Sequence, residues 1–174
     1  MRGAVAEKEK ALAALTAGAK ADFAAWKRPA KLDVPGLVAA YSFDEVAGNK
    51  VTNGVDAKKP GAVHEGAKLV EGKAGKAALL DGENGFTFPG VGALSRDDPF
   101  TLSLFVKPAD HAPRAVVVHQ SRAPIDAGSR GWEVLLENGR VAVGLHHMWP
   151  GNSLKVRTKV AVPVGAWTQI AVTY

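Results

Sequence analysis

The chain has 174 residues, of which 47% are hydrophobic and 22% are charged. This length and balance fit one folded domain with an appendage, and they exclude a disordered chain or a coiled coil. The formal net charge is +5, but Lys and Arg are scattered among acidic residues and form no basic patch with interleaved aromatics, so we expect no nucleic-acid partner.

The sequence contains no cysteine, which excludes disulfides, thiolate metal sites, a cysteine nucleophile and covalent haem attachment through Cys-x-x-Cys-His in this segment. No apolar run approaches the roughly 18 residues that a membrane-spanning helix needs. The start, MRGAVAEKEK, carries Glu and Lys where a signal peptide has an uninterrupted apolar run. We therefore expect no membrane insertion, and we expect any export signal to lie outside this chain.

Apolar residues recur at helical spacing near the N-terminus, at Leu12, Leu15, Ala19, Phe23 and Trp26. This spacing predicts an amphipathic helix over residues 1–28 whose apolar stripe needs a partner surface. Two prolines then interrupt the pattern, and they predict a linker over residues 29–36.

Beyond Gly36 the hydrophobic period changes to two, and the segments become short and rich in β-branched and aromatic residues. Asn138-Gly139 separates two such runs, and Asn-Gly supplies the positive φ angles of a type I′ turn, so WEVLLENGRVAVGL is predicted to be a hairpin. Strands are expected at Leu37–Phe43, Ala62–Glu65, Ala77–Leu80, Phe86–Phe88, Phe100–Lys107, Ala115–Gln120, Trp132–Leu136, Val141–His146, Leu154–Lys159 and Trp167–Tyr174.

Many short strands without intervening helices exclude a parallel α/β sheet and leave a two-sheet sandwich or a barrel. In FTLSLFVKP, alternation places Phe100, Leu102, Leu104 and Val106 on one face, which is predicted to be core. The last run, WTQIAVTY, reaches the end of the chain in mid-strand. We therefore expect a sandwich that lacks later strands and exposes the apolar face that they would cover.

Four stretches together resemble the concanavalin A-like lectin/glucanase superfamily, and specifically its laminin-G-like jelly rolls. They are GLVAAYSFDE, GKAALLDGENGFTFP, FTLSLFVKP and VGAWTQIAVTY. The resemblance implies an all-β fold, an antiparallel two-sheet jelly-roll sandwich over residues 37–174 that is incomplete at its C-terminus.

A narrower resemblance is to the laminin-G-like module of large planctomycete proteins, where it lies between two domains of unknown function in chains that often carry a cytochrome c module. FAAWK is similar to the tail of the preceding helical domain, and HHMWPGNSLKVRTK is similar to a stretch typical of those modules, with matches at Trp149, Pro150, Gly151, Asn152, Val156 and Arg157. The resemblance implies a periplasmic or extracellular location, with any haem bound elsewhere in the parent chain.

Glucanases of the superfamily carry paired carboxylates spaced Glu-x-Asp-x-Glu on one strand, which implies a hydrolase as an alternative. Glu133 and Glu137 have this spacing, but Leu135 occupies the central position. A straight strand separates the two glutamate Cα atoms by roughly 13 Å, whereas retaining hydrolysis needs carboxyl groups about 5–5.5 Å apart. We therefore expect both glutamates to be solvated, with Val134 and Leu136 facing the core, and we expect no enzyme activity.

Metal binding has two candidate sites. His146 and His147 are adjacent, so on a strand they point to opposite faces and are not expected to chelate one ion. Laminin-G-like domains often hold Ca²⁺ through an Asp after the Asp-Gly strand, which implies Asp81 as a ligand; Asn84 adds a hard oxygen in the same turn. The alternative is that Asp81 and Asn84 only build turns.

The stretch around Trp149 is the candidate recognition site. Trp149 precedes a Pro-Gly-Asn turn, so its indole is expected near a hairpin tip, where it could stack on a sugar ring while Asn152 and Arg157 supply hydrogen bonds. The alternative is that Trp149 folds back over a sheet face. The sequence thus predicts a noncatalytic module that binds carbohydrate or neighbouring domains; the alternatives are a hydrolase that uses Glu133 and Glu137, and a structural spacer.

Overall fold

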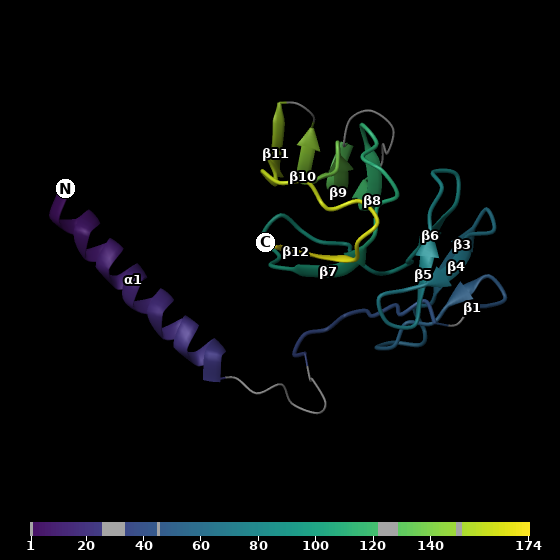
Figure 1. Cartoon of the computed structure of the whole chain (residues 1–174), viewed down its shortest axis with the longest axis horizontal. Coiled ribbons are helices and arrows are strands. Elements are labelled where there is room, and N and C mark those ends of the chain that lie inside the picture. Colours follow the sequence, from purple (N-terminus) through teal and green to yellow (C-terminus); the bar gives the residue numbers. More distant parts are fainter. Residues whose placement is uncertain (1, 26–33, 45, 122–128, 149–150) are drawn as a thin grey trace. The chain divides into compact units, whose positions relative to one another are not determined.

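The computed structural model of the chain describes residues 2–25, 34–44, 46–121, 129–148 and 151–174 (Figure 1). The chain divides into two compact units, Met1–Leu37 and Val38–Tyr174. The first contains α1 (Arg2–Ala25), and the described regular structure of the second consists of antiparallel strands. These are β1 (Val46–Ala47), β2 (Lys50–Val51), β3 (Gly61–His64), β4 (Lys68–Glu71), β5 (Lys76–Leu79), β6 (Gly85–Thr87), β7 (Thr101–Val106), β8 (Ala115–Ser121), β9 (Ser129–Glu137), β10 (Arg140–Met148), β11 (Asn152–Arg157) and β12 (Thr168–Thr173).

The N-terminal helix predicted from the periodicity is observed as α1, while positions 26–28 of the predicted helix, including Trp26, lie outside the described residues. Leu12 and Leu15, which the spacing places on the apolar stripe, are exposed within this unit. No helix in the described part of the chain is long and apolar enough to cross a membrane.

The longest strands form a four-stranded sheet in the order β11-β10-β9-β8. The predicted hairpin at its centre is confirmed: β9 and β10 pair in continuous register up to the turn, where Asn138 and Gly139 have φ angles of 48° and 75°. Both angles lie in the left-handed region that a type I′ turn requires. The turn with the strongest sequence signal therefore connects the two central strands of this sheet.

Strand β8 carries a β-bulge. Val116 pairs with Leu135 and Val118 pairs with Val134, so Val117 is an extra residue without a partner of its own on β9. Beyond the bulge, His119 pairs with Glu133. Because of the extra residue, Val116 shares a face with Leu135, and His119, three residues later, shares that same face with Glu133.

Strands β7 and β12 pair with each other and pack against the four-stranded sheet (Figure 1). The shared core contains Leu136 of β9, Ile170 of β12 and Val162 of the preceding loop. On β7, the side chains at 102, 104 and 106 are half-buried, while those at 101, 103 and 105 are exposed. The predicted orientation of this strand is therefore confirmed.

The rest of the second unit forms two small sheets, β1-β2-β3-β6 and β4-β5. The prediction of a strand at Leu37–Phe43 is wrong, because its described residues belong to no ladder. Ala40 instead donates its N–H to Asn53 Oδ1, at 3.1 Å, and accepts from the N–H of Gly54, at 2.8 Å. The buried Asn53 amide therefore accepts the backbone hydrogen bond that a neighbouring strand would otherwise accept.

The described chain is thus mostly β, with antiparallel sheets and one N-terminal helix. The strands form four small sheets, of four, four, two and two strands, and not two continuous ones. The remaining predicted strands correspond to observed ones whose ends differ by at most three residues, while β1, β2 and β4 were not predicted.

Candidate functional site

Glu133 lies near the middle of the four-stranded sheet, on the side that faces away from β7 and β12, which we call the outer face. It is only 6% exposed. Its Oε1 lies 3.3 Å from His146 Nε2 on β10, and its Oε2 lies 3.6 Å from Nη2 of Arg114. A buried carboxylate is costly unless it is paired and hydrogen-bonded, and here the guanidinium and the imidazole meet that need.

The expectation that Glu133 is solvated is therefore wrong, and the reason lies on the neighbouring strand. Glu133 pairs with Gly144 across the β9–β10 ladder. A Cβ atom at position 144 would collide with His146 Nε2 and would lie 3.2 Å from Glu133 Cγ. The missing side chain creates the space in which the carboxylate and the imidazole meet.

Glu137 shares the outer face but is held by a different strand. Lys155 donates from its ammonium group to Oε1, and Nη1 of Arg157 lies 3.9 Å from Oε2. Both cations belong to β11, so the Lys155 side chain crosses β10 to reach β9. The Glu137 side chain is 19% exposed, so it too is less solvated than expected.

Leu135, between the two glutamates, is 1% exposed although it belongs to the outer face. Its partner across the ladder, Ala142, is fully buried. Small residues in β10 and the long stems of charged side chains can together cover such a position. Around Leu135 the outer face therefore carries paired charges beside buried apolar side chains.

The histidines of the sheet do not form a metal site in the described residues. His146 is buried and His147 is exposed, as expected for neighbours on a strand. His119 Nδ1 lies 3.2 Å from Ser121 Oγ. Within the described residues, no three His, Cys, Asp or Glu side chains gather in a group that could hold a metal ion.

Asp81 and Asn84 close a turn on each other. Asp81 Oδ1 accepts from the backbone N–H groups of Glu83 and Asn84, each at 3.1 Å, and Asn84 Oδ1 accepts from the N–H of Asp81, at 3.2 Å. The backbone N–H of Asn84, followed by that of Glu83, holds the pKa of Asp81 below its ordinary value. These bonds use Asp81 Oδ1 and Asn84 Oδ1 and not Asp81 Oδ2. Ca²⁺ takes six to eight oxygens, so calcium binding at this turn needs further ligands and stays a prediction.

Of the three candidate recognition residues, the two that the structure describes do not lie together. Trp149 lies outside the described residues. Asn152 and Arg157 are both exposed and occupy opposite ends of β11, so their Cα atoms are roughly 17 Å apart. Their odd spacing also places them on opposite faces of the strand. A single ligand contact that includes both residues is not supported by this placement.

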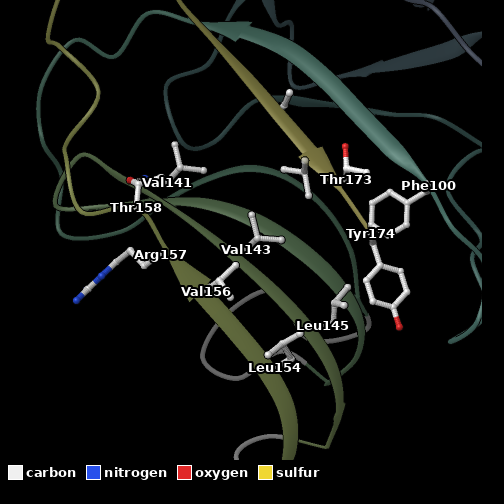
Figure 2. Close-up of a pocket in the computed structure, with 12 residues that line it drawn as sticks. Phe100, Val141, Val143, Leu145, Leu154, Val156, Arg157, Thr158, Thr173 and Tyr174 are labelled. Carbon is white, nitrogen blue, oxygen red and sulfur yellow. Dashed lines mark hydrogen bonds between the residues drawn. The ribbon is translucent and has the colours of Figure 1, made fainter. Parts of the chain in front are cut away.

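An open apolar groove of about 450 Å³ lies between β12 and the inner side of β10 and β11 (Figure 2). Leu154 and Val156 lie on β11, the edge strand of the four-stranded sheet, and are 55% and 56% exposed. The groove is lined by Phe100, Val141, Val143, Leu145, Leu154, Val156, Arg157, Thr158, Ala171, Val172, Thr173 and Tyr174. An apolar face is thus left open along β10, β11 and β12.

The contacts of Glu133 with Arg114 and His146 were missed because alternation tells which residues share a face but not what covers it. One signal was present in the sequence. Each of β9 and β10 contains a glycine, and a hairpin drawn from the Asn-Gly turn pairs Gly144 with Glu133 and Gly131 with His146. Glycine opposite a large polar residue indicates that the polar side chain folds over the strand.

Antiparallel strands in packed layers, with a polar outer face and an apolar groove, define a mostly β domain. A laminin-G model, described as the concanavalin A-like lectin/glucanases superfamily, matches residues 80–174, which is more than half of the chain. The chain belongs to this superfamily. No curated protein and no solved structure among those compared matches the chain.

Proposed function

We propose that the chain is a noncatalytic binding module, with a carbohydrate or a protein as its ligand, in a larger extracytoplasmic protein. The observation that carries this proposal is that both candidate catalytic carboxylates are tied to cations. Glu133 is directed toward Arg114 and His146, and Glu137 toward Lys155 and Arg157. A glucanase of this superfamily needs two carboxyl groups directed at one glycosidic bond.

The arrangement of the pairs argues further against hydrolysis. The cations that hold Glu137 come from β11, whereas Glu133 is held by the His146 imidazole on β10 and by Arg114 in the segment before β8, so the two carboxylates are drawn to different strands. Leu135 is buried between them. An acid or a nucleophile in this position would have to break a partly buried ion pair before it could reach a substrate.

The hydrolase alternative is tested by incubating the wild-type chain and Glu133→Gln with soluble mixed-linkage β-glucan and measuring reducing ends. We expect no release above the buffer control with either protein. Release by the wild type that disappears in Glu133→Gln, while the variant keeps its thermal stability, would replace the binding module with an enzyme.

The tip of the β10–β11 hairpin remains the proposed contact for the ligand. Trp149→Ala and Asn152→Ala should weaken a ligand that stacks there, whereas Arg157→Ala, at the far end of β11, should not. Tryptophan fluorescence during titration with neutral oligosaccharides measures this. If no glycan and no neighbouring domain of the parent protein changes the signal, the structural spacer becomes the better description.

We also propose that the packed layers belong to a two-sheet jelly roll in which one further β-strand of the parent polypeptide covers the groove. Leu154 and Val156 support this, because a soluble domain rarely leaves such a contiguous apolar surface open. Expression of the domain with its downstream sequence should raise solubility relative to the present chain. Equal solubility of the two proteins would count against a covering strand.

The proposed parent is a planctomycete-type protein with a cytochrome c module, in which residues 1–28 end a preceding domain and residues 29–36 form a linker. Leu12 and Leu15 support the first part, because both are exposed on α1 and suit packing against a domain. Sequencing the parent gene tests it. Cys-x-x-Cys-His and a signal peptide in the same reading frame are expected.

A further inference from the structure

Strand β11 lies at one end of the four-stranded sheet, and among the described strands it pairs only with β10. One hydrogen bond shows how its backbone is oriented: Thr158 donates its N–H to the oxygen of Val141, the residue opposite it, at 2.9 Å. In antiparallel pairs, residues that bond across the ladder alternate with residues whose N–H and C=O groups point to the other side. The backbone groups of Val156 therefore point toward β10, and those of Arg157 point toward the open edge of the sheet.

Cations gather on the outer face where β11 ends. Arg140 lies opposite Glu137 in the β9–β10 ladder, and Lys155 and Arg157 both contact the Glu137 carboxylate from β11. Lys159, two residues beyond Arg157, is exposed as well. In Figure 2 the Arg157 side chain extends away from the apolar side chains of the groove. One carboxylate does not balance four cations, so this end of the sheet keeps an excess of positive charge that suits an anionic partner.

The edge of β11 is not guarded against an added strand in the usual way. Edge strands are often protected by a lysine whose charge repels an incoming strand. Lys155 occupies such a position, but its ammonium group crosses β10 and binds Glu137 on β9. On the inner side of β11, Leu154 and Val156 are exposed. The edge therefore has apolar side chains on one face and cations on the other, and its complement is a strand that alternates apolar and acidic residues.

We propose that the open edge of β11 binds an extended acidic segment of a partner protein, which pairs with β11 as an additional strand. Its acidic side chains lie beside Arg157 and the neighbouring cations, and its apolar side chains lie beside Leu154 and Val156. Main-chain hydrogen bonds give such a strand its affinity, and the alternating side chains give it specificity. This inference rests on the proposed binding role and names a protein ligand for it, at a surface apart from the β10–β11 tip and from the strand that covers the groove.

A second copy of the chain does not supply this strand. Two β11 edges in antiparallel pairing would place the cations of one copy beside those of the other, and like charges directly opposite each other destabilise a sheet. In the sequence, acidic residues two positions apart occur at Glu7 and Glu9 and at Asp81 and Glu83, but a lysine and a glycine lie between them instead of an apolar residue. The acidic segment therefore belongs to another protein.

The test is fluorescence anisotropy of a labelled peptide that alternates Glu and Val, titrated with the whole chain. We expect this peptide to bind, and Arg157→Glu should weaken it by about tenfold or more, because an attraction becomes a repulsion. The same variant should bind a peptide that alternates Lys and Val better than the wild type does. Arg157→Lys keeps the charge and should stay within a few-fold of the wild type. Lys73→Glu, an equal charge reversal at an exposed position between β4 and β5, should leave binding unchanged.

Two further measurements separate an added strand from simple attraction of charge. A peptide with all its Glu residues before all its Val residues has the same composition and charge, but it cannot place acidic and apolar side chains on opposite faces, so it should bind more weakly. In amide hydrogen exchange, the alternating peptide should slow exchange of the Arg157 N–H, which points to the open edge. The Val156 N–H, which points toward β10, should be unaffected.

Several results would overturn the inference. Equal binding of the alternating and the block peptide, or an Arg157 N–H whose exchange does not slow, would make the surface a general polyanion site. Binding that Arg157→Glu leaves intact would exclude the cationic end of β11 as the contact. If neither peptide binds, the edge is not a protein site, while the tip of the β10–β11 hairpin is still tested separately through Asn152→Ala. Thermal unfolding of Arg157→Glu beside Lys73→Glu distinguishes lost binding from lost folding.

Discussion

The two halves of the β unit are held together in different ways. From β7 onward, strands of six to nine residues pair in long registers and share a core built on Leu136, Val162 and Ile170. Before β7, strands of two to four residues alternate with loops, and side-chain oxygens accept from the backbone across them. Asn53 joins two segments in this way, and so does Asp44, whose Oδ1 accepts from the N–H of Lys76 at 2.9 Å.

The difference teaches where stability should come from in each half. An apolar core contributes in proportion to the area that it buries and does not depend on pH. Polar clamps contribute through a few hydrogen bonds, and a carboxylate clamp weakens when it is protonated. Substitutions and changes of pH should therefore affect the stability of the two halves differently.

The largest effect is expected from Leu136→Ala in the shared core. Removing a buried leucine side chain should lower the free energy of unfolding by about 2–5 kcal/mol, because the cavity cannot collapse between two sheets. Leu154→Ala, the same change at an exposed groove position, should cost less than about 1 kcal/mol. Urea unfolding followed by circular dichroism measures both. Similar losses in the two variants would contradict the proposed position of the core.

The next effect is expected from Asn53→Ala in the first half. Asn53 is 2% exposed, and its Oδ1 accepts from the N–H groups of Ala40 and Val55 at 3.1 and 3.0 Å. Leaving both donors without a partner should cost about 2–4 kcal/mol. Hydrogen exchange should rise first in residues 38–64 and not in β9 or β10. Asn152→Ala, at an exposed position, serves as the control, and uniform exchange over both halves would make them one cooperative unit.

A smaller effect is expected from Gly144→Ala on the outer face. The added methyl group collides with the His146 imidazole and crowds Glu133, and such overpacking should cost about 1–3 kcal/mol. Gly151→Ala adds the same group where no atom lies within 4 Å and should be neutral. Thermal unfolding of the two variants side by side tests this. A neutral Gly144→Ala would show that the carboxylate and the imidazole do not share that space.

The smallest effect is expected from acid. Hydrogen bonds from the backbone of Lys76 and from Ser42 lower the pKa of Asp44, and those from Asn84 and Glu83 lower that of Asp81, both from 3.8. Because the folded-state pKa values are the lower ones, these bonds stabilise the fold fully above about pH 4, and the contribution is lost as the pH falls through them. Asp81→Asn keeps an acceptor that does not titrate, so it should flatten the loss between pH 5 and 2. Hydrogen exchange in residues 76–87 reports the change, and an unaltered acid profile would exclude Asp81 as its source.

The strands from β7 onward could be predicted because periodicity, turn chemistry and burial agree in them. The hairpin at Asn138 and Gly139 is the best case, since its register follows from the turn alone. The strand prediction at Leu37–Phe43 was wrong because the apolar pattern of this segment resembles a strand. Its backbone hydrogen-bonds instead to the Asn53 side chain and to the N–H of Gly54. Strands of two residues are too short to show any period.

The candidate site could be predicted only in part, for a related reason. Spacing placed Glu133 and Glu137 on one face, but their partners Arg114 and Lys155 are eighteen or more residues away in sequence and meet them only through strand order. Asp81 and Asn84 were predicted to share a turn, and they do: Asp81 Oδ1 accepts from the N–H of Asn84, and Asn84 Oδ1 accepts from the N–H of Asp81. Contacts between strands that are distant in sequence leave no local pattern from which they could be predicted.

The bulge in β8 gives this sheet a tolerance for changes in length. Val117 occupies a place that no residue of β9 requires, so a relative with one residue fewer there could keep His119 facing Glu133 and Ala115 facing Leu136. An alignment of such relatives would then show a one-residue gap inside a strand, although the flanking residues would still face solvent or core as before. Gap placement restricted to loops would misassign the strand positions that lie between the bulge and the loop.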